Sequence, residues 1–204
     1  AAGRWIHPRQ DVHILAVGHG CCVVIESGTH TALYDIGSLS NDNLTHAIVL
    51  PFLRHRGINH IDALFLSHPD IDHYGGTLDL CRSIDVRKVF VSPYFTQDNS
   101  ANLNKADTCL LDELHKRQVS LHFVRQGDTF DMNPVSIDVL WPQPAYEMLL
   151  SDNDSSLVLS VRSGKGAQVL LCGDITEEVQ KLLAAQYDFS AIDVLLLPHH
   201  GSIR

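Results

Sequence analysis

Four side chains that can bind a metal ion lie within six residues of one another: His68, Asp70, Asp72 and His73. They follow residues 61–67, an almost continuous apolar segment that predicts a buried strand. Charged and polar side chains crowded at the end of such a strand repel and desolvate one another unless a cation is present. Imidazole and carboxylate both bind divalent cations, so the spacing predicts a metal site rather than a solvated loop rich in Asp and His by chance.

Three further polar clusters each lie beside a predicted strand: Asp174 after 168–172, His199 and His200 after 192–197, and Asp152 and Asp154 before 157–162. Taken alone, Asp174 is more often the N-cap of a following helix, and an Asp-rich segment such as 152–156 is more often a turn. Adjacent histidines on an extended segment point to opposite sides, so at most one of the pair should reach a given ion. Together, clusters from both halves of the chain supply what a two-metal site needs.

The elements that must position these clusters alternate between strands and helices. Strands are predicted at 12–17, 22–26, 32–35, 61–67, 88–92, 119–125, 135–141, 157–162, 168–172 and 192–197, the last of them buried. Helices are predicted over 41–56, 78–82, 102–118 and 175–186, and Pro51 is the place where the first of them could kink. Two sheets packed face to face, with helices outside, accommodate this count in one domain, 1–204, with halves of roughly 1–125 and 126–204.

Composition narrows the class of protein. The net charge of −9 makes the chain a poor non-specific binder of nucleic acid by itself. No apolar run approaches the roughly 18 residues of a bilayer span, and no signal-peptide pattern opens the chain. The start without Met suggests an excised fragment. The five cysteines form no C-x-x-C pair, so we expect buried free thiols and no disulfide framework.

The run His68-x-Asp70-x-Asp72-His73 resembles the signature H-x-[HD]-x-D-H of the metallo-β-lactamase superfamily. More specifically, the chain resembles the soluble hydrolase domain of ComEC-type DNA-internalisation (competence) proteins. That resemblance extends over five further segments: 15–20, 33–37, 154–159, 171–174 and 198–202. It implies an α/β (α+β) fold, a four-layer αβ/βα sandwich. Because the family pattern normally continues with another strand and helix, we expect a truncated C-terminus.

The resemblance also implies two divalent metal ions at one edge of the two sheets. His68 and Asp70 would hold the first ion, and Asp72 and His73 the second. Asp174 would bridge both ions.

His199 or His200 would complete the second site. The superfamily's usual third histidine of the first site is missing, so Asp152, Asp154 or a water must replace it. This oxygen-rich set shifts the expected metal from zinc toward manganese or magnesium, although enough imidazole remains for zinc.

Two residues depart from the ComEC pattern or extend it. His19 stands where the pattern has Gln, and Cys21 stands where it usually has Asp. His19 could contact the substrate or protonate a leaving group, or it could have a packing or hydrogen-bonding role. Ser202 could donate a hydrogen bond to a phosphate, and a turn role is equally compatible.

The function implied is metal-assisted hydrolysis of a phosphodiester in DNA. Asp72 and Asp174 would orient the attacking water or take its proton, and the histidine of the 199/200 pair that binds no metal would protonate the leaving oxygen. The expected partners are DNA and the membrane channel region of the same full-length protein, with this soluble domain on the extracytoplasmic face of the plasma membrane. The alternatives are a hydrolase of small esters, thioesters or lactams, and a catalytically degenerate accessory domain of DNA uptake.

Overall fold

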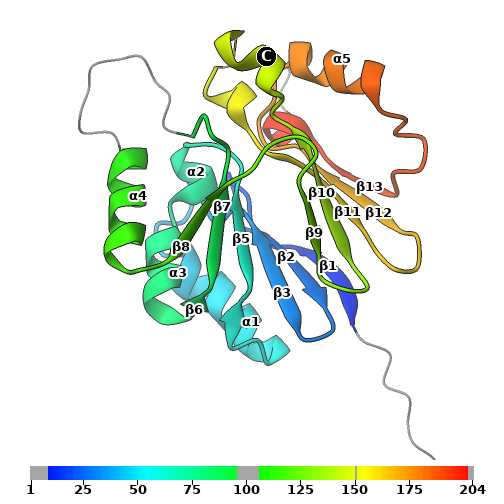
Figure 1. Ribbon diagram of the computed structural model, residues 1–204. Coiled ribbons are helices and arrows are strands. Elements are labelled where there is room, and N and C mark those ends of the chain that lie inside the picture. The colour runs from blue at the N-terminus through cyan, green and yellow to red at the C-terminus, as the bar shows by residue number, and fades with distance from the viewer. Residues whose placement is uncertain (1–8, 96–105, 150, 202–204) are drawn as a thin grey trace, which may run out of the picture.

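The computed structural model describes residues 9–95, 106–149 and 151–201. In this part of the chain, a six-stranded and a five-stranded sheet pack face to face, and helices cover their outer faces (Figure 1). The first sheet takes its strands from residues 10–123, and the second from residues 129–196. The predicted αβ/βα sandwich of mixed class is therefore confirmed.

The first sheet combines an antiparallel and a parallel part. Its strands, in spatial order, are β1 (Gln10–Ile14), β2 (Val23–Ser27), β3 (His30–Tyr34), β5 (Ala63–Leu66), β7 (Lys88–Val91) and β8 (Ser120–Phe123). The first three pair antiparallel, and β3, β5, β7 and β8 run parallel. Parallel neighbours need crossovers, and these contain the helices α1 (Leu50–Arg56), α2 (Ile71–Tyr74), α3 (Thr77–Ser83) and α4 (Ala106–Lys116). A two-residue pairing of β4 (His60–Ile61) with β6 (Asp85–Val86) lies beside this sheet.

The second sheet is mostly antiparallel. Its strands, in spatial order, are β13 (Val194–Leu196), β12 (Gln168–Leu171), β11 (Val158–Arg162), β10 (Ser136–Trp141) and β9 (Thr129–Asp131). Only the pair β12 and β13 is parallel, and the helix α5 (Glu177–Gln186) precedes β13 in the chain and covers part of the outer face (Figure 1). The carboxyl ends of these two strands therefore meet at one edge.

Successive side chains of a strand point to opposite faces of the sheet, so each strand contributes to two layers of the core. Val24 of β2 packs with the helices of the first half, whereas its neighbours Val23 and Ile25 pack between the two sheets. A third apolar cluster joins the second sheet to α5 and contains Trp141 and Leu183. Three apolar layers therefore separate four layers of secondary structure.

The helix predicted over 41–56 consists of a π-helical turn, Thr45–Val49, followed by α1. Pro51 lies in the first turn of α1, where its missing N–H costs nothing, so it begins a helix instead of kinking one. Sequence analysis did not predict β9 or α2. Of the helix predicted over 102–118, residues 102–105 lie outside the described residues.

Two predictions about burial were wrong. β13 is an edge strand, and Val194 and Leu195 are exposed because β13 pairs with β12 alone in the described chain. Of the five cysteines, all free thiols, three are buried; Cys81 is half-buried and Cys109 is exposed on the outer face of α4. Within the described residues, no helix combines the length and the apolar composition of a bilayer span.

The core makes a direct prediction about stability. Leu64 has no exposed surface and packs between the first sheet and its helices. Leu64→Ala should lower the free energy of unfolding by about 2–5 kcal/mol, because it leaves a cavity in a closely packed layer. Urea unfolding measures this change, with Leu39→Ala as the control, since Leu39 is 57% exposed. Equal effects of the two substitutions would contradict the assignment of this layer.

Candidate metal centre

Asp35 is a fully buried carboxylate at the carboxyl end of β3. Its Oδ1 accepts a hydrogen bond from Ser67 N at 2.7 Å. Its Oδ2 accepts two, from Ser67 Oγ and from His73 Nδ1, each at 2.8 Å. Because a carboxylate only accepts hydrogen bonds, the proton of this contact lies on Nδ1 of His73, and the Nε2 atom points away from Asp35.

Ser67 fixes the second imidazole in the same way. Its single hydroxyl hydrogen is directed to Asp35, so the same oxygen can accept from His68 Nδ1, 3.0 Å away. His68 therefore also turns its Nε2 atom away from the protein frame. This is the arrangement by which outer hydrogen bonds orient metal-binding histidines.

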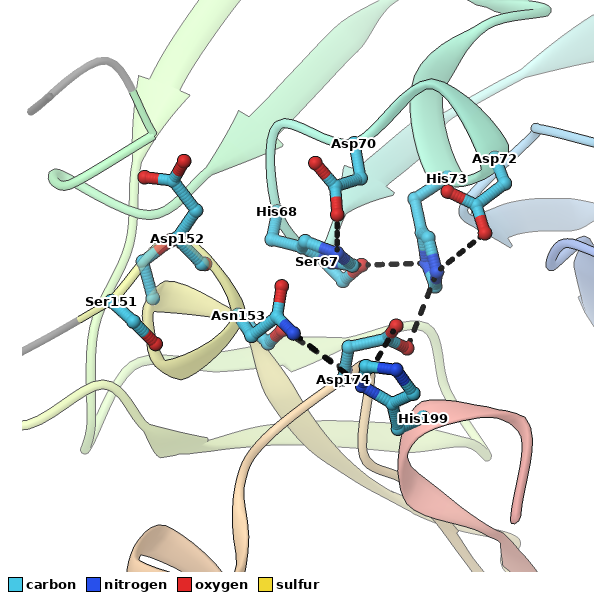
Figure 2. Close-up of polar contacts among 12 residues, drawn as sticks. Ser67, His68, Asp70, Asp72, His73, Ser151, Asp152, Asn153, Asp174 and His199 are labelled. Atoms are coloured by element: carbon cyan, nitrogen blue, oxygen red, sulfur yellow. Dashed lines mark hydrogen bonds and ion pairs between the residues drawn. The ribbon is translucent and has the colours of Figure 1, made fainter. Parts of the chain in front are cut away.

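The two Nε2 atoms converge on carboxylates that come from different sheets (Figure 2). His68 Nε2 lies 3.3 Å from Asp70 Oδ2, and His73 Nε2 lies 3.3 Å from Asp174 Oδ1 and 4.0 Å from Asp72 Oδ2. Asp70 is half-exposed, whereas the other four side chains are buried.

The adjacent histidines after β13 both face the cluster. His200 Nε2 lies 3.3 Å from Asp72 Oδ2 and 4.0 Å from Asp174 Oδ2, and His199 Nδ1 lies 3.6 Å from Asp174 Oδ2. The prediction of an extended segment was wrong, because both residues adopt left-handed backbone with φ of 49° and 53°. That turn removes the alternation of an extended chain and lets both rings reach one carboxylate.

Two observations indicate that the residues fit a divalent cation. The buried Nε2 atoms of His68 and His73 have no hydrogen-bond partner. A buried polar atom without a partner destabilises the folded protein, and a bound cation would supply that partner. In the described chain, the cluster's carboxylates pair with histidines and with no lysine or arginine.

The donors fall into two groups, each with two imidazoles and one carboxylate. One group is His68, His73 and Asp174; the other is His19, Asp72 and His200. The grouping differs from the expected pairing of His68 with Asp70 and of Asp72 with His73. Each group has the composition of a zinc or iron site. Asp70, whose Oδ2 atom lies 3.3 Å from His68 Nε2, adds a carboxylate beside the first group, and the assignment of the individual ligands is a proposal.

In the described structure, the carboxylates of the segment around Asp154 make no contact with the cluster, where a third ligand was expected. Asp154 accepts hydrogen bonds from Thr176 N at 3.0 Å and from Ser151 Oγ at 2.8 Å, so its carboxylate orders the turn before α5. Asp152 is exposed, and Figure 2 draws no contact from it to the cluster. The neighbouring Asn153, which sequence analysis missed, lies with its Nδ2 atom 3.4 Å from His199 Nδ1.

The other predicted residues have different outcomes. Asp174 is not the N-cap of α5, because Thr176 occupies that position. His19 lies at the cluster, with its Nε2 atom 3.5 Å from Asp72 Oδ2. Ser202 lies outside the described residues. Asp35 had no role assigned, although an Asp at the end of an apolar strand was the same signal that singled out Asp174.

Two features away from the cluster have simpler explanations. Asp11, His13 and Glu26 lie close enough to hold a cation, but Arg56 donates to both carboxylates at 2.8 and 2.7 Å, which makes this an ion-pair network. A hollow of about 600 Å³ lies on the second sheet beside Tyr187 and contains none of the cluster's donors.

The charges of the cluster shift two pKa values in opposite directions. Burial alone would lower the pKa of His73, but Asp35 and Asp174 raise it to about 10. Burial alone would raise the pKa of Asp174, but the adjacent imidazole of His73, whose Nε2 atom lies 3.3 Å from Asp174 Oδ1, lowers it to about 2. In the metal-free protein at neutral pH, His73 is therefore cationic and Asp174 anionic, and a metal ion has to displace a proton from His73.

The raised pKa of His73 predicts a loss of stability at alkaline pH. The folded metal-free protein holds this proton more tightly than the unfolded chain, so its contribution is complete below pH 6.5 and disappears as the pH rises to about 10. Urea unfolding in the presence of a chelator, repeated across that range, measures the slope. His73→Gln should flatten it, and an unchanged slope in this variant would contradict the assignment.

The hydrogen bonds of Asp35 predict an indirect effect on metal binding. Asp35→Asn keeps the size of the side chain but removes the charge that orients His73, so zinc affinity should fall about 10–100-fold. Competition with a chromophoric chelator measures the affinity. Asp62→Asn is the matched control, since Asp62 also accepts a backbone hydrogen bond, from Thr31, but does not contact the cluster. Equal affinities in both variants would show that Asp35 does not orient a ligand.

Comparison with known proteins agrees with this geometry. ComE operon protein 3 of Bacillus subtilis is 30% identical over 160 residues, which are 78% of this chain and 20% of that protein. Competence protein ComA of Neisseria gonorrhoeae is 25% identical over 192 residues, 94% of this chain and 24% of that protein. The expected resemblance to competence proteins is confirmed, and the chain spans about a fifth to a quarter of their length.

The fold has solved counterparts. MEM-A1, a subclass B3 metallo-beta-lactamase from a soil metagenome library, superposes with a TM-score of 0.62 at 15% identity, over 94% of this chain and 80% of that one. The family model of the metallo-beta-lactamase superfamily matches residues 12–204, a range that contains every donor of the cluster. The chain therefore belongs to the metallo-beta-lactamase superfamily.

Proposed function

We propose that this domain is a metal-dependent phosphodiesterase that hydrolyses DNA within a ComEC-like DNA-uptake protein. The observation that carries the proposal is the pair of donor groups, each with two histidines and one aspartate, at the edge where the two sheets meet. The similarity to competence proteins supports DNA as the substrate.

Two divalent ions held by these groups would lower the pKa of a water molecule and neutralise charge on the phosphoryl oxygens. The side chains of the domain would do the remaining work. Asp174 contacts His73, His199 and His200, so it is placed to align both donor groups. Asp72 or Asp174 would accept the proton of the attacking water.

A proton donor for the leaving oxygen is available at the solvent side of the cluster. The imidazoles of His199 and His200 are partly exposed, with 32% and 26% of their side-chain surface accessible. His199 belongs to neither donor group, and its Nδ1 atom lies 3.4 Å from Asn153 Nδ2, so it is the histidine of the pair that we assign as the general acid.

The acidity of the chain limits how DNA can be bound. With a net charge of −9, the domain needs the bound cations and other parts of the full-length protein to attract a polyanion. We propose that the membrane channel region of that protein delivers DNA to this domain on the extracytoplasmic face. Cleavage by the isolated domain should therefore be slow and sensitive to salt.

The proposal is tested with a labelled oligonucleotide and Mn²⁺, Zn²⁺ or Mg²⁺. The double variant Asp72→Ala, Asp174→Ala should lose at least about 100-fold in cleavage rate, because it removes a carboxylate from each donor group. Asp112→Ala, on the exposed face of α4, is the control. Failure of the metal-loaded protein to cleave with any of the three ions, or full activity of the double variant, would overturn the proposal.

A further inference from the structure

We propose that His19 is a ligand of the second metal ion, together with Asp72 and His200, and that it sets the metal preference of this position. This inference rests on the proposed metal-dependent function and adds a ligand to it.

His19 and His200 converge on one oxygen atom of Asp72. His19 Nε2 lies 3.5 Å and His200 Nε2 lies 3.3 Å from the same atom, Oδ2 of Asp72. The centres of the two imidazole rings are 4.8 Å apart, so the rings share one side of the carboxylate. The three donor atoms lie within 4.8 Å of one another, which is the spacing of ligands around one cation.

The backbone holds His19 in place against Asp72. The N–H of His19 donates to Ser40 Oγ at 2.9 Å, and the carbonyl of His19 accepts from Leu39 N at 2.7 Å. Two residues later, Cys21 N donates to the carbonyl of Asp72 at 3.1 Å. The loop is therefore ordered on both sides of the imidazole, so a ligand position would require little rearrangement.

Gly20 explains why the loop can approach so closely. A Cβ atom at this position would lie 2.3 Å from Gly37 O and 2.8 Å from Asp72 O, and the φ of +153° is a conformation that side chains rarely adopt. The backbone beside His19 is thus packed directly on the backbone of Asp72. This close backbone packing keeps the imidazole of His19 beside the carboxylate of Asp72.

The imidazole of His19 lies on the solvent side of this donor group. The side chain of His19 is 59% exposed, whereas that of Asp72 is 12% exposed. An ion held by these ligands would keep a face open to solvent, as catalytic sites with three protein ligands do.

The ligand types predict which metal ion the second position prefers. Two imidazoles and one carboxylate suit zinc, whereas magnesium prefers oxygen ligands in an octahedral arrangement. With Gln in place of His19, one nitrogen donor is replaced by an amide oxygen, and zinc should lose more affinity than manganese.

The test measures metal binding and not activity. Metal-free wild-type protein and His19→Gln are titrated with Zn²⁺ and with Mn²⁺ by equilibrium dialysis and chelator competition, with His55→Gln, an exposed histidine of α1, as the control. His19→Gln should keep one zinc ion at wild-type affinity and weaken the second by at least about tenfold, with a smaller change for manganese. The absorption spectrum of the Co²⁺-loaded protein should also change in His19→Gln and not in His55→Gln.

The outcomes separate the two proposals. Two zinc ions bound with equal affinity by wild type and His19→Gln would overturn the role of His19 and leave the proposed function intact. Equal losses for zinc and manganese, with an unchanged Co²⁺ spectrum, would overturn it as well, because they indicate a structural effect. A wild-type protein that binds no divalent ion would overturn the proposed function itself.

Discussion

The burial of one negative charge organises the functional half of this protein. Asp35 has no exposed surface, and an ionised carboxylate in such a place costs several kcal/mol unless hydrogen-bond donors surround it. Ser67 and His73 supply three donors, and both come from the crossover that follows β5. The need to satisfy this carboxylate therefore fixes the loop on which four of the cluster's donors lie: His68, Asp70, Asp72 and His73.

The same loop also joins the two sheets. The N–H of Leu157 donates to Ser67 O at 2.9 Å, and the hydroxyl of Tyr34 donates to Leu157 O at 2.8 Å. Asp174 reaches His73 across this junction, with its own N–H bonded to Ser156 Oγ. A metal centre built this way depends on the packing of both halves of the sandwich, so neither half could hold two ions alone.

Most of the fold could be predicted from local sequence patterns, because apolar residues recur with different spacings in helices and in strands. The periodicity of apolar residues placed most strands and helices close to their observed bounds. The clusters at His68–His73 and Asp174 were found because polar side chains directly follow buried strands. What could not be predicted were features decided by tertiary contacts: the exposure of β13 and the left-handed turn at His199.

The grouping of donors shows the same limit. Sequence spacing suggests that neighbours in the chain share an ion, but the two sheets meet so that His73 lies nearer to Asp174 than to Asp72. His19 is the clearest case, because its approach to Asp72 depends on a loop contact far away in sequence. The role of Asp35 was likewise hidden, since its partners come from another crossover.

The edge position of β13 gives the two donor groups different mechanical support. His68 and His73 lie on the packed interior of the sandwich, whereas His200 follows a strand that pairs over only three residue pairs. Such a strand belongs to the parts of a protein that open most easily. A cation held by His200 would therefore also tie this strand to the rest of the sandwich, because ion binding and docking of the strand would each stabilise the other.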